Sequence, residues 1–181
     1  MKNKLPYISS LCLLLFACTG EPDFSFIPEI SFNNIQVLTV SSQGLLGVTK
    51  KDSVVMTVNF QDGDGDLGFT PAELTALKKT TGDSLQTFIA DIFVQRNGRF
   101  LRSNPKEKFG GNIPIRFKQG SKAGPIEGTV DYSATFEYNV FQGIPLLRGK
   151  SDTIKFAIQI KDRALNKSNV VETSPIVIYA K

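Results

Sequence analysis

The 181-residue chain contains no histidine and no tryptophan. Histidine is the commonest general base and an important metal ligand, so its absence excludes Ser-His-Asp catalysis, Cys-His catalysis and histidine-bound zinc. Glycoside hydrolysis by two carboxylates needs only Asp and Glu. However, the sequence offers no such pair on separate strand ends beside an aromatic platform. We therefore expect a protein that is not an enzyme.

Cysteine is confined to the first eighteen residues, at Cys12 and Cys18. The remainder of the chain therefore has no thiol, no disulfide and no cysteine-based metal site. An excess of charge is also lacking, with 21 basic and 17 acidic residues. Removal of Lys2 and Lys4 with a signal segment would leave 19 basic residues against 17 acidic ones, a net charge of +2. Because this charge is weak and dispersed, we expect no nucleic-acid partner.

Residues 1–17 have the pattern of a lipoprotein signal peptide. Lys2 and Lys4 give a positive start, and the apolar segment 11–17 is too short to span a bilayer. The segment ends in Leu15-Phe16-Ala17-Cys18, which resembles a bacterial lipobox, although the phenylalanine is bulkier than the usual residue at its place. This resemblance implies that Cys18 is lipidated and attaches the chain to a membrane. The alternative is an ordinary secretory signal with an incidental cysteine.

Residues 18–27 are expected to form the lipidated N-terminus and its tether, because Thr19–Asp23 is polar, acidic and interrupted by proline. No aspartate directly follows Cys18, so retention at an inner membrane is not signalled. We expect the outer membrane, on its periplasmic or cell-surface face. Residues 28–181 then remain for one domain, which is long enough to bury its own core.

The sequence after residue 27 predicts several short β-strands and one helix. Apolar alternation predicts one or two edge strands in 28–40, a central strand at 53–60, and further strands at 88–95, 99–103, 112–118, 128–138, 153–160 and 174–179. Loops are expected at 41–51, 119–124 and 141–150. Asn97-Gly98 predicts a hairpin turn, and Thr70-Pro71-Ala72-Glu73 predicts the start of a helix that continues to about Lys79. Seven to nine strands with little helix indicate an all-β, immunoglobulin-like β-sandwich with one short helix.

The segment Asp62-Gly63-Asp64-Gly65-Asp66-Leu67-Gly68 directly follows the predicted central strand. It places three carboxylates at alternate residues, an arrangement of hard oxygen ligands that suits calcium. Such carboxylates repel one another by about 1 kcal/mol per pair at 4 Å in water unless a cation or hydrogen-bond donors compensate. The predicted metal ligands are Asp62, Asp64 and Asp66. The alternative is a solvated acidic turn, in which Asp and Gly simply suit tight geometry.

The same spacing overlaps that of an EF-hand, with Glu73 at the twelfth place. However, Leu67 stands where an EF-hand requires glycine, and a strand rather than a helix precedes the loop. We therefore reject an EF-hand and regard Glu73 as a doubtful ligand.

Two blocks carry a resemblance to a known family. They are Val58–Gly68, and Ile158–Ser168 followed by Ser174–Ile178. Together they resemble an uncharacterised family of Bacteroidetes outer-membrane lipoproteins with an immunoglobulin-like or fibronectin-III-like domain. This resemblance implies an exported, anchored β-sandwich and carries no established reaction.

The sandwich adds a geometric expectation. If 54–60 and 153–160 take the places of strands B and F, the loops that follow them lie at one pole. The three carboxylates of the acidic loop then face Asp162 and Asn166, which are included among the predicted metal ligands. These two residues would either complete an oxygen cage or hold the acidic loop through hydrogen bonds. Their segment is also a good turn sequence on its own.

The first functional hypothesis is a non-catalytic, lipid-anchored cell-envelope protein with a calcium-stabilised loop. It would serve in binding, adhesion or envelope assembly with an unidentified protein or glycan partner. The second is a periplasm-facing structural lipoprotein whose acidic loop is only a turn. The third is a carbohydrate-binding or carbohydrate-processing accessory lipoprotein. Arg96, Arg99 and Arg102 would then bind an anionic glycan, or would otherwise form a solvated edge that discourages strand aggregation.

Overall fold

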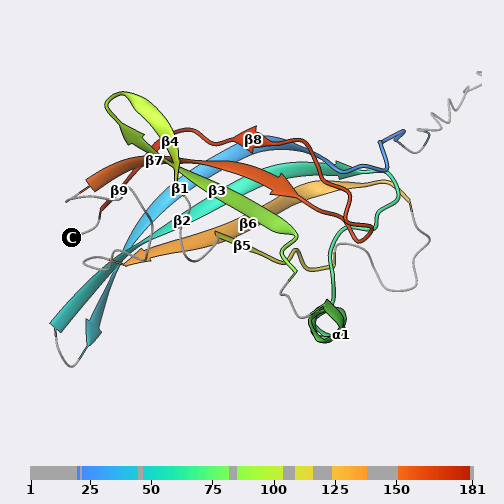
Figure 1. Cartoon of the computed structure of the whole chain (residues 1–181), viewed down its shortest axis with the longest axis horizontal. Coiled ribbons are helices and arrows are strands. Elements are labelled where there is room, and N and C mark those ends of the chain that lie inside the picture. The colour runs from blue at the N-terminus through green and yellow to red at the C-terminus, as the bar shows by residue number, and fades with distance from the viewer. Residues whose placement is uncertain are drawn as a thin grey trace, which may run out of the picture.

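The computed structural model describes residues 20, 22–44, 47–81, 85–103, 109–115, 124–137 and 151–179. These residues form nine β-strands in two antiparallel sheets and one short helix (Figure 1). The elements are β1 (Glu29–Gly44), β2 (Gly47–Asp62), α1 (Pro71–Thr81), β3 (Phe88–Arg96), β4 (Arg99–Ser103), β5 (Phe109–Gly111), β6 (Ile126–Glu137), β7 (Ser151–Ile160), β8 (Val171–Glu172) and β9 (Ile176–Tyr179). The predicted all-β sandwich with one short helix is confirmed.

Strand pairing reproduces the order of an immunoglobulin-like sandwich. One sheet has the order β1-β2-β6, and in the other β3 lies between β4 and β7, while β7 also pairs with β8 and β9. In immunoglobulin terms β1, β2 and β6 occupy the places of strands A, B and E, and β3, β7 and β9 those of C, F and G. The two central strands therefore stand where the sequence placed strands B and F.

The core is built by strict alternation along these central strands. Their inward residues are each at most 4 % exposed: Val54, Met56, Val58 and Phe60 on β2, and Ile154, Phe156, Ile158 and Ile160 on β7. Burial of each such side chain contributes about 1.5–3 kcal/mol. A one-residue slip of either strand would turn the whole set toward solvent, so this alternation fixes the register.

The two hairpins differ in how well they were predicted. Asn97 and Gly98 have φ angles of 51° and 76° and join β3 to β4, as expected for a tight hairpin turn. The loop expected at 41–51 is wrong, because β1 and β2 continue as a paired hairpin to Gly44 and Gly47. Side chains on this extension are exposed, so backbone pairing rather than apolar burial defines it. Hydrophobic alternation therefore gave little sign of these strands.

Other differences concern short strands. The strand expected at 112–118 is not formed over the described part 112–115, which contains only an isolated bridge between Phe69 and Pro114. Instead β5 forms just before it, pairing Phe109 and two glycines with β3. The two-residue strand β8 was also unpredicted, since two residues show no alternation. The predicted loop at 141–150 lies outside the described residues, as does 119–124 apart from Gly124.

A β-bulge between Phe32 and Asn34 shifts the register within β1, which explains why 28–40 resembled one or two strands. The predicted signal segment and Cys18 lie outside the described residues. Among the residues that the structure describes, no helix has the length and apolar character needed to cross a membrane.

Candidate cation site

The acidic loop begins inside the sandwich. Inward-facing positions alternate along β2 from Val54 to Phe60, and the same alternation turns Asp62 toward the interior. Asp62 is accordingly 0 % exposed, whereas Asp64 and Asp66 are half-buried. Because side chains alternate between the two faces of the strand, the carboxylate of Asp62 lies at the end of the core.

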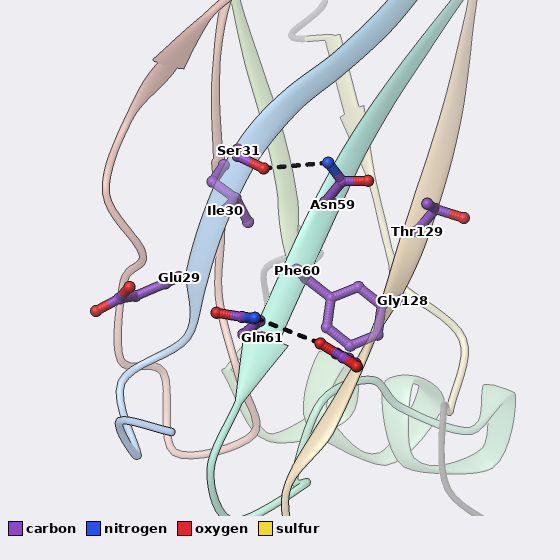
Figure 2. A pocket seen from close by; sticks show the side chains of 9 residues that line it. Glu29, Ile30, Ser31, Asn59, Phe60, Gln61, Gly128 and Thr129 are labelled. Carbon is purple, nitrogen blue, oxygen red and sulfur yellow. Dashed lines mark hydrogen bonds between the residues drawn. The ribbon is translucent and has the colours of Figure 1, made fainter. Parts of the chain in front are cut away.

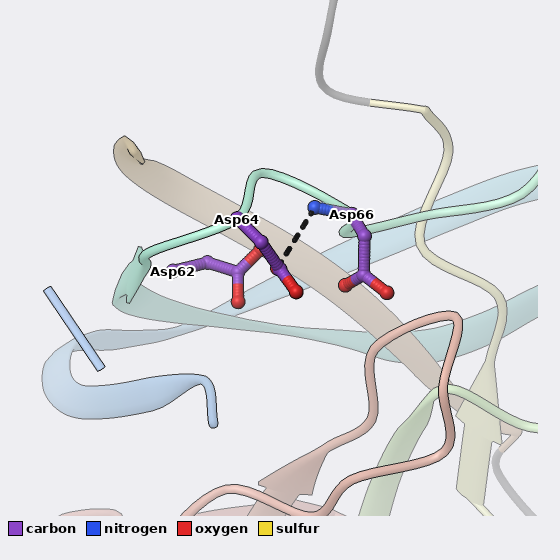
Figure 3. A group of neighbouring side chains, drawn as sticks. All are labelled: Asp62, Asp64 and Asp66. Carbon is purple, nitrogen blue, oxygen red and sulfur yellow. Dashed lines mark hydrogen bonds between the residues drawn. The ribbon is translucent and has the colours of Figure 1, made fainter. Parts of the chain in front are cut away.

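The three aspartates of the loop converge. One carboxylate oxygen from each of Asp62, Asp64 and Asp66 lies within 4.8 Å of the others, and Figure 3 shows the carboxylates gathered on one side of the loop. The backbone N–H of Asp66 donates to Oδ1 of Asp64 at 3.4 Å. Both carboxylate oxygens of Asp62 and Oδ1 of Asp66 are buried and accept no hydrogen bond within the described part of the chain. Buried polar groups without partners are costly, and buried charges more so.

The electrostatics of the site reflect this arrangement. The pKa of Asp62 is raised to about 7, first by burial and then by the charges of Asp64, Asp66 and Asp162, while the nearby backbone N–H of Asp66 opposes the rise. The pKa of Asp66 is also raised, first by burial and then by Asp162 and Asp64. A bound cation would stabilise the ionised carboxylates and so lower both pKa values.

The glycines of the loop are explained by packing. A Cβ atom would lie 2.3 Å from the carbonyl oxygen of Phe24 at Gly63, from that of Gly124 at Gly65, and from that of Pro114 at Gly68. The last two glycines also have positive φ angles, of 70° and 96°. Three separate segments therefore press against the loop and fix its backbone. This packing accounts for the glycines, but it supplies no partner for the buried carboxylate oxygens.

The second predicted loop lies at the same pole. The charge of Asp162 raises the pKa of both Asp62 and Asp66, and backbone N–H groups of Arg163 and Ala164 oppose the rise at Asp66. Asp162 is itself buried, and its two oxygens accept hydrogen bonds from the backbone N–H and side-chain Nδ2 of Asn166, at 2.7 and 2.8 Å. Both hydrogen bonds therefore lie within the turn 162–166 and stabilise it. The structure thus makes Asp162 a neighbour of Asp62 and Asp66, with its own oxygens already partnered.

Glu73 has other partners. It forms a capping box at the start of α1: the N–H of Thr70 donates to Oε2 of Glu73 at 2.8 Å, and the N–H of Glu73 donates to Oγ1 of Thr70 at 3.2 Å. The predicted helix start is therefore confirmed. Glu73 also forms an ion pair with Arg163, and hydrogen bonding from this guanidinium, followed by that from Thr70, lowers the pKa of Glu73 to about 2. These bonds give Glu73 a structural role.

Arg163 is the site residue that sequence reasoning missed. Its Nη1 donates to the carbonyl oxygen of Gly68 at 3.0 Å, and its guanidinium lies 5.1 Å from the ring centre of Phe69. It therefore connects the turn after β7 to both the acidic loop and α1. Only the fold brings Arg163 to Glu73, 90 residues away in sequence, so no local motif would have identified the pair.

A polar groove of about 560 Å³ lies on the outer face of the first sheet, beside the same pole (Figure 2). Nδ2 of Asn59 donates to Oγ of Ser31 at 3.1 Å, and Nε2 of Gln61 donates to Oε2 of Glu127 at 3.3 Å. Phe60 also lines the groove, but this residue is only 4 % exposed because its side chain belongs to the core. The groove therefore offers amides, hydroxyls and two carboxylates, those of Glu29 and Glu127.

The arginines near the hairpin belong to the opposite pole. Arg96 pairs with the buried Asp152 at 2.5 Å, and Arg102 pairs with Asp91 at 2.7 Å. Two of the three arginines considered for a glycan thus hold carboxylates of the protein itself.

Comparison of the chain with protein-family models, with curated proteins and with solved structures finds no match in any of the three. The resemblance to Bacteroidetes lipoproteins therefore stays a prediction.

Proposed function

We propose that the protein is a non-catalytic, lipid-anchored cell-envelope module of the outer membrane whose acidic loop binds calcium. The ion rigidifies one pole of the sandwich, and the module serves in binding, adhesion or envelope assembly. Cys18 carries the lipid. Asp62, Asp64 and Asp66 supply the protein oxygens for the ion, with Asp162 as a neighbouring negative charge.

The observation that carries this proposal is the state of Asp62. Its side chain is fully buried, and neither oxygen has a hydrogen-bond partner in the described structure, although two further carboxylates lie close by. A solvated acidic turn would expose its carboxylates to water. Calcium takes six to eight oxygen ligands at about 2.3–2.6 Å, so carboxylates, backbone carbonyls and water would share the coordination.

The test is a thermal melt of the mature chain, with Cys18 replaced by serine, in EDTA and in millimolar calcium. A ligand that binds only the native state raises the melting temperature by mass action. We expect calcium to raise it in the parent chain and not in Asp64→Asn. Asp52→Asn, at the opposite end of the inward-facing series of β2, is the matched control and should retain the calcium response. An equal melting temperature of the parent in both buffers would reject the ion site.

The second candidate is carbohydrate binding in the polar groove. Asn59, Gln61 and Glu127 could exchange hydrogen bonds with sugar hydroxyls, although the exposed aromatic ring on which many sugars stack is not seen among the described lining residues. A glycan array would reveal a ligand. Binding that Asn59→Ala abolishes while leaving the calcium response intact would favour this function over the first.

A further inference from the structure

Exposed apolar side chains gather at the pole that holds the acidic loop. Phe26 and Ile27 are 69 % and 53 % exposed, and Leu165 and Val170 are 52 % and 58 % exposed. Two hydrogen bonds place their segments at this pole. The N–H of Gly63 donates to the carbonyl oxygen of Ser25 at 2.8 Å, and Nδ2 of Asn169 donates to that of Ile30 at 2.8 Å. Single exposed apolar residues are ordinary, but a group of four around one pole is a candidate interaction surface.

Leu165 stands out within this group. Its φ angle is 67°, a left-handed conformation that costs a residue with a side chain roughly 1–2 kcal/mol. The turn uses the N–H of Leu165, which donates to the carbonyl oxygen of Asp162 at 3.2 Å. However, the fold gains little by burying its side chain, which is half exposed. Asn or Gly would suit the backbone better, so an exposed leucine here points to a contact outside the chain.

The base of this turn is cationic. Lys161 and Lys167 form an isolated antiparallel bridge, so the two lysines stand beside each other below Leu165. We call residues 161–167 the pole turn. An apolar tip above lysines matches the interface of a phospholipid bilayer, where the tip enters the acyl boundary and ammonium groups meet phosphates.

The tether determines which end of the sandwich can reach the membrane. The carbonyl oxygen of Phe24 lies against Gly63 of the acidic loop, and five residues separate Phe24 from Cys18. Even fully extended, this segment spans at most about 20 Å. The other end of β2 lies much farther away: Val48 is 14 residues before Asp62, about 45 Å along the strand.

We propose that the pole turn, together with Phe26 and Ile27, lies on the phospholipid surface that carries the anchor. The cation site then faces the membrane, and the β1–β2 hairpin points away from it toward other envelope components. This inference rests on the proposed lipidation of Cys18. It adds a second, non-covalent membrane contact that would fix the orientation of the sandwich on the bilayer.

The experiment uses the natural absence of tryptophan. Full-length chain is processed and acylated in a bacterial host, and acylation of Cys18 is verified by mass spectrometry. It is then reconstituted into phosphatidylethanolamine and phosphatidylglycerol vesicles, with or without brominated acyl chains that quench nearby tryptophan. Leu165→Trp is the reporter at the pole turn, and Val170→Trp is a second reporter should the first fail to fold. Val48→Trp is the matched control, since Val48 is also exposed, at 59 %.

We expect brominated lipid to quench Leu165→Trp and Val170→Trp and to leave Val48→Trp unchanged. Equal, unquenched emission from all three variants of an acylated chain would overturn the membrane contact while leaving the anchor intact. This is also the outcome expected if a partner protein covers the turn. Quenching of Val48→Trp alone would reverse the orientation and reject the inference. A chain without acylation of Cys18 would overturn the anchor itself, and the mass measurement distinguishes that result from the others.

Discussion

The two poles of the sandwich treat the same residue type in opposite ways. The inward-facing series of β2 begins at Asp52 and ends at Asp62, and β7 begins near Asp152 and is followed by Asp162; all four aspartates are buried. At the hairpin pole, Asp52 accepts hydrogen bonds from Oγ1 of Thr39 and the N–H of Tyr179, each at 2.7 Å. At the other pole Asp62 accepts none from the described residues.

Nearby hydrogen-bond donors separate a structural buried aspartate from a candidate ligand. Where donors surround the carboxylate, as for Asp52, Asp152 and Asp162, the residue closes the end of an inward-facing series and needs no ligand. Asp62 occupies an equivalent place, yet its neighbours are two more carboxylates. Its environment resembles that of a cation ligand more than that of a structural cap. Three measurements test this contrast between the poles.

The largest expected effect is a pH dependence that calcium removes. The pKa of Asp62 is raised from 3.8 to about 7 in the folded protein. Between these values the native state retains a proton that the unfolded state has lost, so the free energy of unfolding falls as pH rises from about 4 to 7. The fall is at most about 4 kcal/mol, because each pKa unit corresponds to 1.36 kcal/mol. Chemical denaturation in EDTA across this range measures it.

Calcium should make the free energy of unfolding depend less on pH between about 4 and 7, because the ion favours the ionised carboxylates. Asp62→Asn should reduce the same pH dependence in EDTA as well, because it removes the titrating carboxyl. A stability in EDTA that is constant or rises between pH 4 and 7 would contradict the unpartnered state of Asp62, and with it the contrast between the poles.

The second measurement compares one aspartate from each pole in EDTA at neutral pH. Asp152→Ala leaves Arg96 without the carboxylate it pairs with, and Arg96 is three-quarters buried, with 25 % of its side chain exposed. Removal of one partner from a fully buried pair costs about 3–5 kcal/mol, and we expect about 2–3 kcal/mol here because of the partial exposure. Asp62→Asn should instead raise the stability by about 1–2 kcal/mol, since it removes an uncompensated charge. Urea titrations of both variants give the comparison, and two changes of the same sign would show that the poles are equivalent.

The sequence predicted the elements with strong local rules. Alternation located β2 and β7, and because Asp62 and Asp162 continue the inward series of each strand, their arrival at one pole followed from the sandwich. The capping box at Thr70 and Glu73 and the turn at Asn97 likewise depend on neighbouring residues alone. These features needed no knowledge of distant contacts.

The remaining features depend on such contacts. The extension of the β1–β2 hairpin is held by backbone pairing of exposed residues, and β5 and β8 are too short to show a period. The unpartnered state of Asp62 is set by which side chains the fold brings around it. Glu73 illustrates the same limit: its spacing suited a ligand, but the fold supplied Arg163 as its partner.

The smallest expected effect concerns this Arg163–Glu73 pair, which ties the pole turn to α1. The pKa of Glu73 is lowered from 4.5 to about 2, chiefly by hydrogen bonding from Arg163. The pair therefore contributes stability that is fully present above about pH 4.5 and is lost as pH falls toward 2, the opposite sign to Asp62. Arg163→Ala should raise the pKa of Glu73 toward its ordinary value, as measured by NMR titration of its side-chain carboxyl. Arg163→Lys should restore only part of the shift, because an ammonium lacks the two-pronged geometry of a guanidinium. An unchanged pKa of Glu73 in Arg163→Ala would mean that the capping box alone holds the carboxylate, and that the ion pair does not connect the pole turn to α1.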